Sequence, residues 1–392
     1  MAVRVPGFLA AGVACGIKDG SQLDLAVIAS ERPAVGAAVF TRNRVPGAPV
    51  LVSRPRARRG RVRAVVVNSG VSNVATGKQG TRDAREMTAA VGRELEVPAG
   101  EVLVSSTGVI GVPLPMGRIR KGIPAAVKAL SATGWNRAAR AILTTDTRPK
   151  LVHEHAGRFA LLGVAKGSGM TMPNMATMLA YLVTDLAIER SWLAGVLHEV
   201  VDSTFNRFSI DGETSTSDSV VIMSNGAAGN RPIGAGSRRG PEFERALSAV
   251  CQELVEKLAA DGEGTTRLAD VVVSGARSHA HAERIARKIA NSVLVKTALF
   301  GSDPNFGRLV QAAGAAGVPI QTDRLGVRVG GVWLLRNGVP VGGRQSLGRA
   351  ARAMKRKRVE LAVVVGSGIG RATLLTCDLS YEYVRINAEY TT

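Results

Sequence analysis

The sequence predicts a mixed α/β fold, because strand-length apolar runs alternate with longer segments of helical periodicity. Phe159–Ala165 and Met178–Val183 are continuously apolar, as buried strands are. One helix face is marked by apolar residues at a spacing of three or four, namely Phe243, Leu247, Val250, Leu254 and Leu258. The chain of 392 residues is 45% hydrophobic but 4% aromatic, so we expect a core built mainly from Ala, Val, Leu and Ile.

The N-terminal part predicts a sheet followed by alternating helices and strands. In chain order, the predicted elements are strands at Leu25–Ala29, Gly36–Phe40, Val50–Val52 and Arg63–Val67, a helix through Ala84–Leu95, a strand at Val102–Ser106 and a helix at Arg137–Leu143. The strand Arg63–Val67 ends in Asn68–Gly70, and the strand that begins at Val102 runs into a polar turn at Thr107–Gly108.

The C-terminal part predicts a helix at Glu189–Phe205, a polar loop at Asp211–Asp218 and further strands. From about residue 276 the pattern changes, with Gly330-Gly331 and Asn337-Gly338 between short apolar runs, as in β-hairpins. The prediction is a main α/β unit at 1–275, a smaller α+β domain at 276–375 and a tail at 376–392.

The net charge of +20 raises the question of nucleic-acid binding. Much of the excess lies in Arg54–Arg63 and Arg349–Arg358, which lack the interleaved aromatic residues of single-strand binders. We therefore expect no specific nucleic-acid recognition. Three widely spaced cysteines argue against a disulfide framework, and no apolar run reaches the ~20 residues of a membrane helix. A cytoplasmic protein without a metal is predicted.

The stretch from Lys166 to Asp185 carries the chemistry. Gly167 and Gly169 allow a sharp turn that presents backbone amides, and Thr177 stands at the start of a buried strand. Cleavage of the chain before Thr177 would place an α-amine with a pKa of about 8 beside its own hydroxyl, as a base. The alternative is an ordinary β-branched residue that begins a strand.

This stretch closely resembles the self-cleaving site of the ornithine acetyltransferase family, the glutamate N-acetyltransferases of arginine biosynthesis. Matching residues recur from Gly12 to Thr392. The resemblance implies a layered fold of the N-terminal-nucleophile type and self-cleavage between Ala176 and Thr177. It also implies an α chain of residues 1–176, a β chain of residues 177–392 and an α2β2 heterotetramer.

The resemblance assigns roles to residues whose local patterns also allow plain turns, caps or surface positions. Thr177 is the implied nucleophile, with Thr107 and Gly108 as the oxyanion hole. The implied substrate-binding residues are Thr144, Lys166, Thr177, Glu263, Asn387 and Thr392. The chain departs from the family pattern at Val71, Glu213 and Phe306.

The predicted reaction transfers acetyl from N2-acetyl-L-ornithine to L-glutamate by a ping-pong mechanism, through acetyl-Thr177 and without a cofactor. Some family members also take acetyl from acetyl-CoA. The first alternative is a related N-terminal-nucleophile aminopeptidase or amidase, which passes its acyl group to water. The second is a basic polyanion-binding protein, in which Thr177 has no chemical role.

Overall fold

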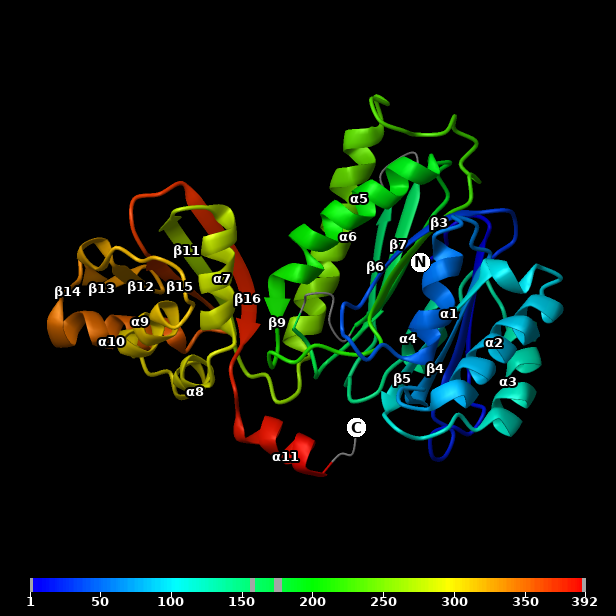
Figure 1. Ribbon diagram of the computed structural model, residues 1–392, viewed down its shortest axis with the longest axis horizontal. Helices are drawn as coiled ribbons and strands as arrows, with labels where there is room; N and C mark the ends of the chain where they lie inside the picture. Colours follow the sequence, from blue (N-terminus) through cyan, green and yellow to red (C-terminus); the bar gives the residue numbers. More distant parts are fainter. Residues whose placement is uncertain (1–2, 156–158, 173–177, 390–392) are drawn as a thin grey trace. The chain divides into compact units, whose positions relative to one another are not determined.

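The computed structural model describes residues 3–155, 159–172 and 178–389, and it divides into two compact units (Figure 1). Of the described residues, the first unit comprises those up to 206 and those at 213–258, and the second comprises those at 207–212 and 259–389. The predicted smaller domain, 276–375, falls inside the second unit. Predicted cleavage residues Ala176 and Thr177, and the terminal Thr392, lie outside the described residues.

The first unit contains two sheets. In order across the first sheet, the strands are β1 (Phe8–Val13), β2 (Leu25–Ser30), β4 (Ala64–Val71) and β5 (Val102–Val109). Across the second sheet they are β3 (Val35–Phe40), β10 (Ser219–Ser224), β8 (Leu179–Thr184), β7 (Ala160–Lys166) and β6 (Lys150–His155).

The helices of this unit are α1 (Ala48–Ala57), α2 (Gly77–Glu94), α3 (Met116–Lys128), α4 (Trp135–Ala141), α5 (Arg190–Ser203) and α6 (Gly240–Ala260), whose last two residues fall in the second unit. A 3-10 turn, Ala99–Glu101, precedes β5, and another, Phe205–Arg207, follows α5.

The sheets and helices of the first unit form layers. One face of β2 and β4 presents residues such as Ala26 and Val65 to a core that also contains Leu162 and Tyr181 of the second sheet. Alternate residues of the same strands point the other way, into a core lined by α2 and α3. Helix α6 packs against β7, with Leu254 next to Gly163. The predicted layered α/β fold is confirmed.

The second unit is built on one mixed sheet. Across it the strands are β14 (Val339–Pro340), β13 (Val332–Arg336), β12 (Gly326–Val329), β15 (Arg358–Val364), β11 (Leu268–Ala276), β16 (Gly370–Cys377) and β9 (Phe208–Ser209). Its remaining helices are α7 (His279–Ala290), α8 (Val293–Gly301), α9 (Phe306–Gly314), α10 (Gly343–Met354) and α11 (Tyr381–Glu389), with a 3-10 turn at Thr322–Arg324. Both predicted hairpin turns are present, between β12 and β13 and between β13 and β14.

The structure corrects three sequence predictions. Val50–Val52 is not a strand but part of helix α1, which has Pro49 in its first turn. The strand predicted at Arg63–Val67 continues through Asn68–Gly70 in β4. Thr107–Gly108, expected as a turn, lies inside β5, which pairs with β4 there. Sheet pairing therefore fixes the backbone that carries the polar side chains of these two strand ends.

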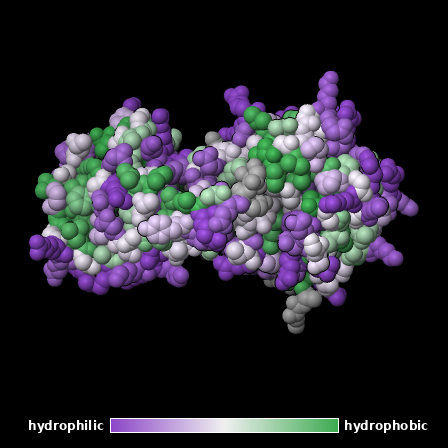
Figure 2. Space-filling view, turned by 90° about the horizontal axis from the view of Figure 1, so that it is seen from below, coloured by the Kyte–Doolittle hydropathy of each residue, from purple (hydrophilic) through white to green (hydrophobic). Residues whose placement is uncertain are grey.

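Hydrophilic residues cover much of the face shown in Figure 2, as the high content of arginine and lysine leads one to expect. Hydrophobic residues are exposed between them, in small groups. Within residues 3–155, 159–172 and 178–389, no helix combines the length and apolarity that crossing a membrane requires.

Candidate active site

Thr107 and Gly108 stand near the end of β5, opposite Ser69 and Gly70 of β4. Gly108 has a φ of +125°, and a Cβ atom there would lie 2.3 Å from the carbonyl carbon of Gly70. Both the backbone angle and the close approach of the two strands therefore require glycine. This contact fixes the backbone on which Thr107 is carried.

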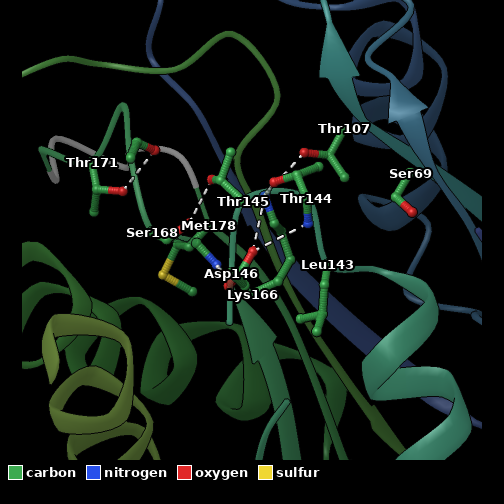
Figure 3. Close-up of polar contacts among 12 residues, drawn as sticks. Ser69, Thr107, Leu143, Thr144, Thr145, Asp146, Lys166, Ser168, Thr171 and Met178 are labelled. Atoms are coloured by element: carbon green, nitrogen blue, oxygen red, sulfur yellow. Dashed lines mark hydrogen bonds and ion pairs between the residues drawn. The ribbon is translucent and has the colours of Figure 1, made fainter. Parts of the chain in front are cut away.

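Lys166 ends β7, and its ammonium group brings two predicted site residues together (Figure 3). Its Nζ donates hydrogen bonds to the Thr144 Oγ1 at 2.7 Å and to the Thr107 Oγ1 at 3.2 Å. The side chain of Lys166 is buried. The surface-lysine interpretation is therefore wrong for Lys166, and the two threonine hydroxyls accept hydrogen bonds from a buried cation.

Asp146 lies beside this lysine and was not singled out in the sequence. Its Oδ2 is 3.8 Å from the Lys166 Nζ, its Oδ1 accepts a hydrogen bond from the Gly167 amide at 2.8 Å, and Lys150 forms an ion pair with it. Burial acts to raise the pKa of Asp146, but the two ammonium groups and the Gly167 amide outweigh it and hold this pKa below its usual value. Asp146 is thus a carboxylate that fixes the Gly167 turn and Lys166.

The loop of Thr144 is held from a second direction by Lys18. The Lys18 Nζ donates hydrogen bonds to the Leu143 carbonyl at 2.6 Å and to the Leu23 carbonyl at 3.1 Å. Burial lowers the pKa of the Lys18 ammonium to about 8, and the nearby Lys166 acts in the same direction. Lys18 therefore fixes the backbone immediately before Thr144.

The chain on both sides of the Pro173–Thr177 segment is bound by one polar loop, Glu213–Asp218. The Met172 amide donates to the Glu213 carbonyl at 2.8 Å, and the Met178 amide donates to the Asp218 Oδ1 at 2.9 Å. The departure from the family pattern at Glu213 thus falls at a position that contacts its neighbour through the backbone.

Glu263 and Asn387, two other predicted substrate residues, lie together in the second unit. The Asn387 Nδ2 on helix α11 donates to the Glu263 Oε2 at 2.8 Å, and Glu263 is buried. The start of α11 is fixed by Ser380, whose hydroxyl donates to the Gly264 carbonyl at 2.6 Å. The C-terminal segment up to Glu389 is thus an ordered helix that carries Asn387 to Glu263.

The sequence did not point to the residues that support the predicted site residues and their backbone, namely Lys18, Asp146, Lys150 and Asp218. Two of them carried a readable signal. Asp146 stands in the same Thr-Thr-Asp-Thr motif as Thr144, and Lys150 follows it at a spacing of four. The contacts of Lys18 with Leu143 and of Asp218 with Met178 join residues that are distant in sequence, so these roles depend on the fold.

Comparison with known proteins identifies the family. The sequence model of the ArgJ family matches residues 9–392. The arginine biosynthesis bifunctional protein ArgJ of Geobacter sulfurreducens is 46% identical, with 100% of each chain covered. That of Synechococcus sp. is 45% identical, with 98% of this chain and 96% of the relative covered.

A solved structure agrees with these matches. The crystal structure of the ArgJ protein of Bacillus halodurans has 36% sequence identity and a TM-score of 0.50, and the match covers 53% of this chain and 96% of that one. The chain therefore belongs to the ArgJ family of arginine-biosynthesis enzymes, which confirms the family and the enzyme class predicted from the sequence.

Proposed function

We propose that this chain transfers the acetyl group of N2-acetyl-L-ornithine to L-glutamate through an acetyl ester on Thr177. The observation that carries the proposal is the buried ammonium of Lys166, which donates hydrogen bonds to the hydroxyls of Thr107 and Thr144. Because each oxygen accepts from a cation, each hydroxyl hydrogen is left to point at a ligand.

The first step we propose is self-cleavage. The Thr177 Oγ attacks the carbonyl carbon of Ala176, and the peptide C–N bond breaks as the nitrogen of Thr177 takes a proton. Water then hydrolyses the resulting ester and leaves Thr177 with a free α-amine. Support comes from the length of the solved chain of the Bacillus halodurans protein. The match covers 96% of that chain but 53% of this one, so that chain is little more than half as long as this one. Cleavage at this site would leave chains of comparable size.

Acetyl transfer would then proceed in two half-reactions. The α-amine of Thr177 takes the proton of Oγ as this oxygen attacks the acetyl carbonyl, and the Thr107 hydroxyl with the Gly108 amide stabilises the oxyanion. The C–N bond to ornithine breaks, and the same amine protonates the leaving nitrogen. Glutamate attacks the acetyl ester in the reverse sequence, releasing N-acetylglutamate and restoring Thr177.

Substrate binding would use charge and hydrogen bonds to the amino-acid substrate. The Lys166 ammonium suits a carboxylate, and the Thr144 hydroxyl that it orients suits the same group. The role of Glu263, whose buried carboxylate accepts a hydrogen bond from Asn387, in binding the side-chain ammonium of ornithine is proposed from the family resemblance. The role of Thr392 in substrate binding is a proposal from the family resemblance alone.

Denatured mass spectrometry tests the nucleophile. We expect two chains, of 176 and 216 residues, from the wild type and one intact, inactive chain from Thr177→Ala. An intact chain in the active wild type, or normal turnover by Thr177→Ala, would rule out the mechanism.

Ornithine release tests the acceptor. For an acetyltransferase, steady release of ornithine requires added glutamate, whereas the aminopeptidase or amidase alternative releases ornithine at the same rate without it. The names of the relatives describe bifunctional proteins, so we also propose acetyl-CoA as a second acetyl donor. Assays with acetyl-CoA and glutamate alone should then give N-acetylglutamate. An α2β2 assembly in the cytoplasm is proposed from the family resemblance.

A further inference from the structure

Asp218 is a buried carboxyl group for which the reaction above has no role. It is 1% exposed and lies at the end of the Glu213–Asp218 loop, directly before β10. Its Oδ1 accepts the hydrogen bond of the Met178 amide at 2.9 Å. The nitrogen of that amide is covalently bonded to the carbonyl carbon of Thr177, so Asp218 acts one residue from the proposed nucleophile.

The backbone around Asp218 adds to this attachment. The Ser219 amide donates to the Met178 carbonyl at 3.2 Å, and Ser219 and Leu179 are paired in the parallel register of β10 and β8. On the other side of the Pro173–Thr177 segment, the Met172 amide donates to the Glu213 carbonyl. One loop thus binds the residues that flank this segment at both ends.

The loop is itself attached to the chain that follows β3. Thr41 donates through its Oγ1 to the Ser215 carbonyl at 2.7 Å and through its amide to the Asp218 carbonyl at 3.1 Å. Asn43 donates to the Thr214 carbonyl at 2.9 Å, and the Gly47 amide donates to the Thr216 carbonyl at 2.9 Å. These four bonds make the loop a fixed support for the Met178 amide.

We propose that Asp218 is a positioning residue for self-cleavage, which holds the Met178 amide and thereby fixes the backbone that carries Thr177. The inference rests on the proposed function, because it assumes that Thr177 is the nucleophile. Attack on a neighbouring carbonyl requires the reacting atoms to be held near contact distance, so an unanchored Thr177 backbone should slow the reaction.

The protonation state of Asp218 agrees with a role as a neutral hydrogen-bond acceptor rather than as a charged carboxylate. Burial raises its pKa well above the usual value, and the charged group that acts against this, the Lys166 ammonium on β7, does not outweigh it. Thr41, which follows β3, and Met178, which precedes β8, contact Asp218 and are uncharged. The hydrogen bonds from the Met178 amide and the Ser215 side chain also act to lower this pKa, and they do not outweigh burial either.

The rate of self-cleavage after cell-free synthesis, followed by denatured mass, tests the proposal. Asp218→Ala removes the acceptor, and we expect cleavage to slow by ~10²-fold. Asp218→Asn keeps a neutral side chain with an acceptor oxygen of the same geometry, and it should cleave at nearly the wild-type rate. Asp378→Ala is the matched control, because Asp378 is another buried acid that accepts backbone amides, those of Thr266 and Arg267 in the second unit.

Normal cleavage by Asp218→Ala would overturn the proposal, and so would cleavage by Asp218→Asn that is as slow as that by Asp218→Ala. Slow cleavage by Asp378→Ala would also count against it, because the loss of any buried acid would then suffice. An intact wild type would instead defeat the proposed function, and would do so before any variant is compared.

A second measurement is independent of cleavage and uses Thr177→Ala as its background. Above pH 4 Asp218 ionises in the unfolded chain but stays neutral in the folded protein. The wild-type protein therefore loses folding stability as pH rises toward the raised pKa of Asp218. Asp218→Asn should therefore have the higher melting temperature at pH 7 to 8, with the difference disappearing near pH 4. If the difference in melting temperature grew toward acid pH instead, Asp218 would be ionised in the folded protein, and its assignment as a neutral acceptor would be overturned.

Discussion

At the scale of single residues, the hydroxyl of Thr107 provides the most direct test of the oxyanion hole. It accepts a hydrogen bond from the buried Lys166, so its own hydrogen can be directed at a developing negative charge. Thr107→Ala should lower kcat by about 10²-fold, the usual effect of losing one oxyanion donor.

Single-turnover acetylation of Thr177 is the measurement for this variant, because it isolates the acyl-transfer step. Thr107→Ser keeps the hydroxyl and is the matched control, and we expect it to recover most of the rate. Equal rates for Thr107→Ala and the wild type would exclude this hydroxyl from the oxyanion hole.

Asp146 should matter for stability as well as for position. Asp146→Asn leaves the buried ammonium groups of Lys166 and Lys150 without this carboxylate, and breaking such a buried pair costs about 3–5 kcal/mol. The free energy of unfolding from urea denaturation at pH 7 checks this. Glu86→Gln, which removes an exposed ion pair with Arg120, is the control and should change little.

The pH dependence of the Asp146 contribution has a definite sign. The folded pKa of Asp146 is lowered, so its contribution is fully present above the unfolded pKa of about 4 and is lost as pH falls through the folded value. The stabilities of the wild type and Asp146→Asn should therefore converge in strong acid. A difference that persists unchanged there would contradict the ionised state of Asp146.

The residues proposed to contact the substrate or the oxyanion could be predicted from the sequence more easily than the residues that support them. Thr107, Thr144 and Lys166 stand in short motifs, and the structure brings all three together. Lys18 and Asp218 stand in no motif of this kind, because their roles depend on which strands become neighbours. That pairing is a property of the whole sheet, which a local pattern does not contain.

At the scale of elements, the close approach of β4 and β5 predicts a strict requirement for glycine at position 108. Gly108→Ala combines a φ of +125° with a Cβ atom 2.3 Å from the Gly70 carbonyl carbon. The strands must separate, so we expect a loss of more than about 1 kcal/mol of stability and slow self-cleavage.

Gly117→Ala is the matched control for this prediction. Gly117 lies in the first turn of α3, and a Cβ atom there meets nothing within 4 Å. Alanine favours a helix over glycine by about 1 kcal/mol at most, so thermal unfolding should show a neutral or stabilising change. Equal melting temperatures for Gly108→Ala and the wild type would mean that the strands adjust without cost.

Most strands and helices followed from periodicity, and the failures have physical reasons. Val50–Val52 is three apolar residues long, too short for a period to distinguish a strand from a helix, and it lies in α1. The pattern ended the strand of β4 before Asn68, and the end of β5 looked like a turn because of Gly108. Pairing between the two strands overrode that local preference, since each supplies the other's hydrogen bonds.

At the scale of the whole molecule, the second sheet of the first unit predicts how the two product chains behave. Its strand order takes β3 from the segment before Thr177, then β10 and β8 from the segment after it, and then β7 and β6 from the first segment again. The two chains would thus alternate within one sheet.

The pairing between these strands is extensive. Leu161–Lys166 of β7 pairs with Leu179–Thr184 of β8 over six residues, and Ser219–Ser224 of β10 pairs with Val35–Phe40 of β3 over six more. All six residues of β8 and of β10 are buried. Separating the chains would expose these strands and leave their backbone groups unpaired, which costs far more than the breaking of one peptide bond returns.

We therefore expect cleaved protein to elute as one species in native size-exclusion chromatography, at the volume of uncleaved Thr177→Ala. In denaturant the same sample should resolve into chains of 176 and 216 residues. Chains that separate under native conditions would show that the interleaved sheet does not hold the cleaved protein together. Because Lys166 ends β7 in one chain and Met178 precedes β8 in the other, activity also depends on this sheet, and any separated chain should be inactive.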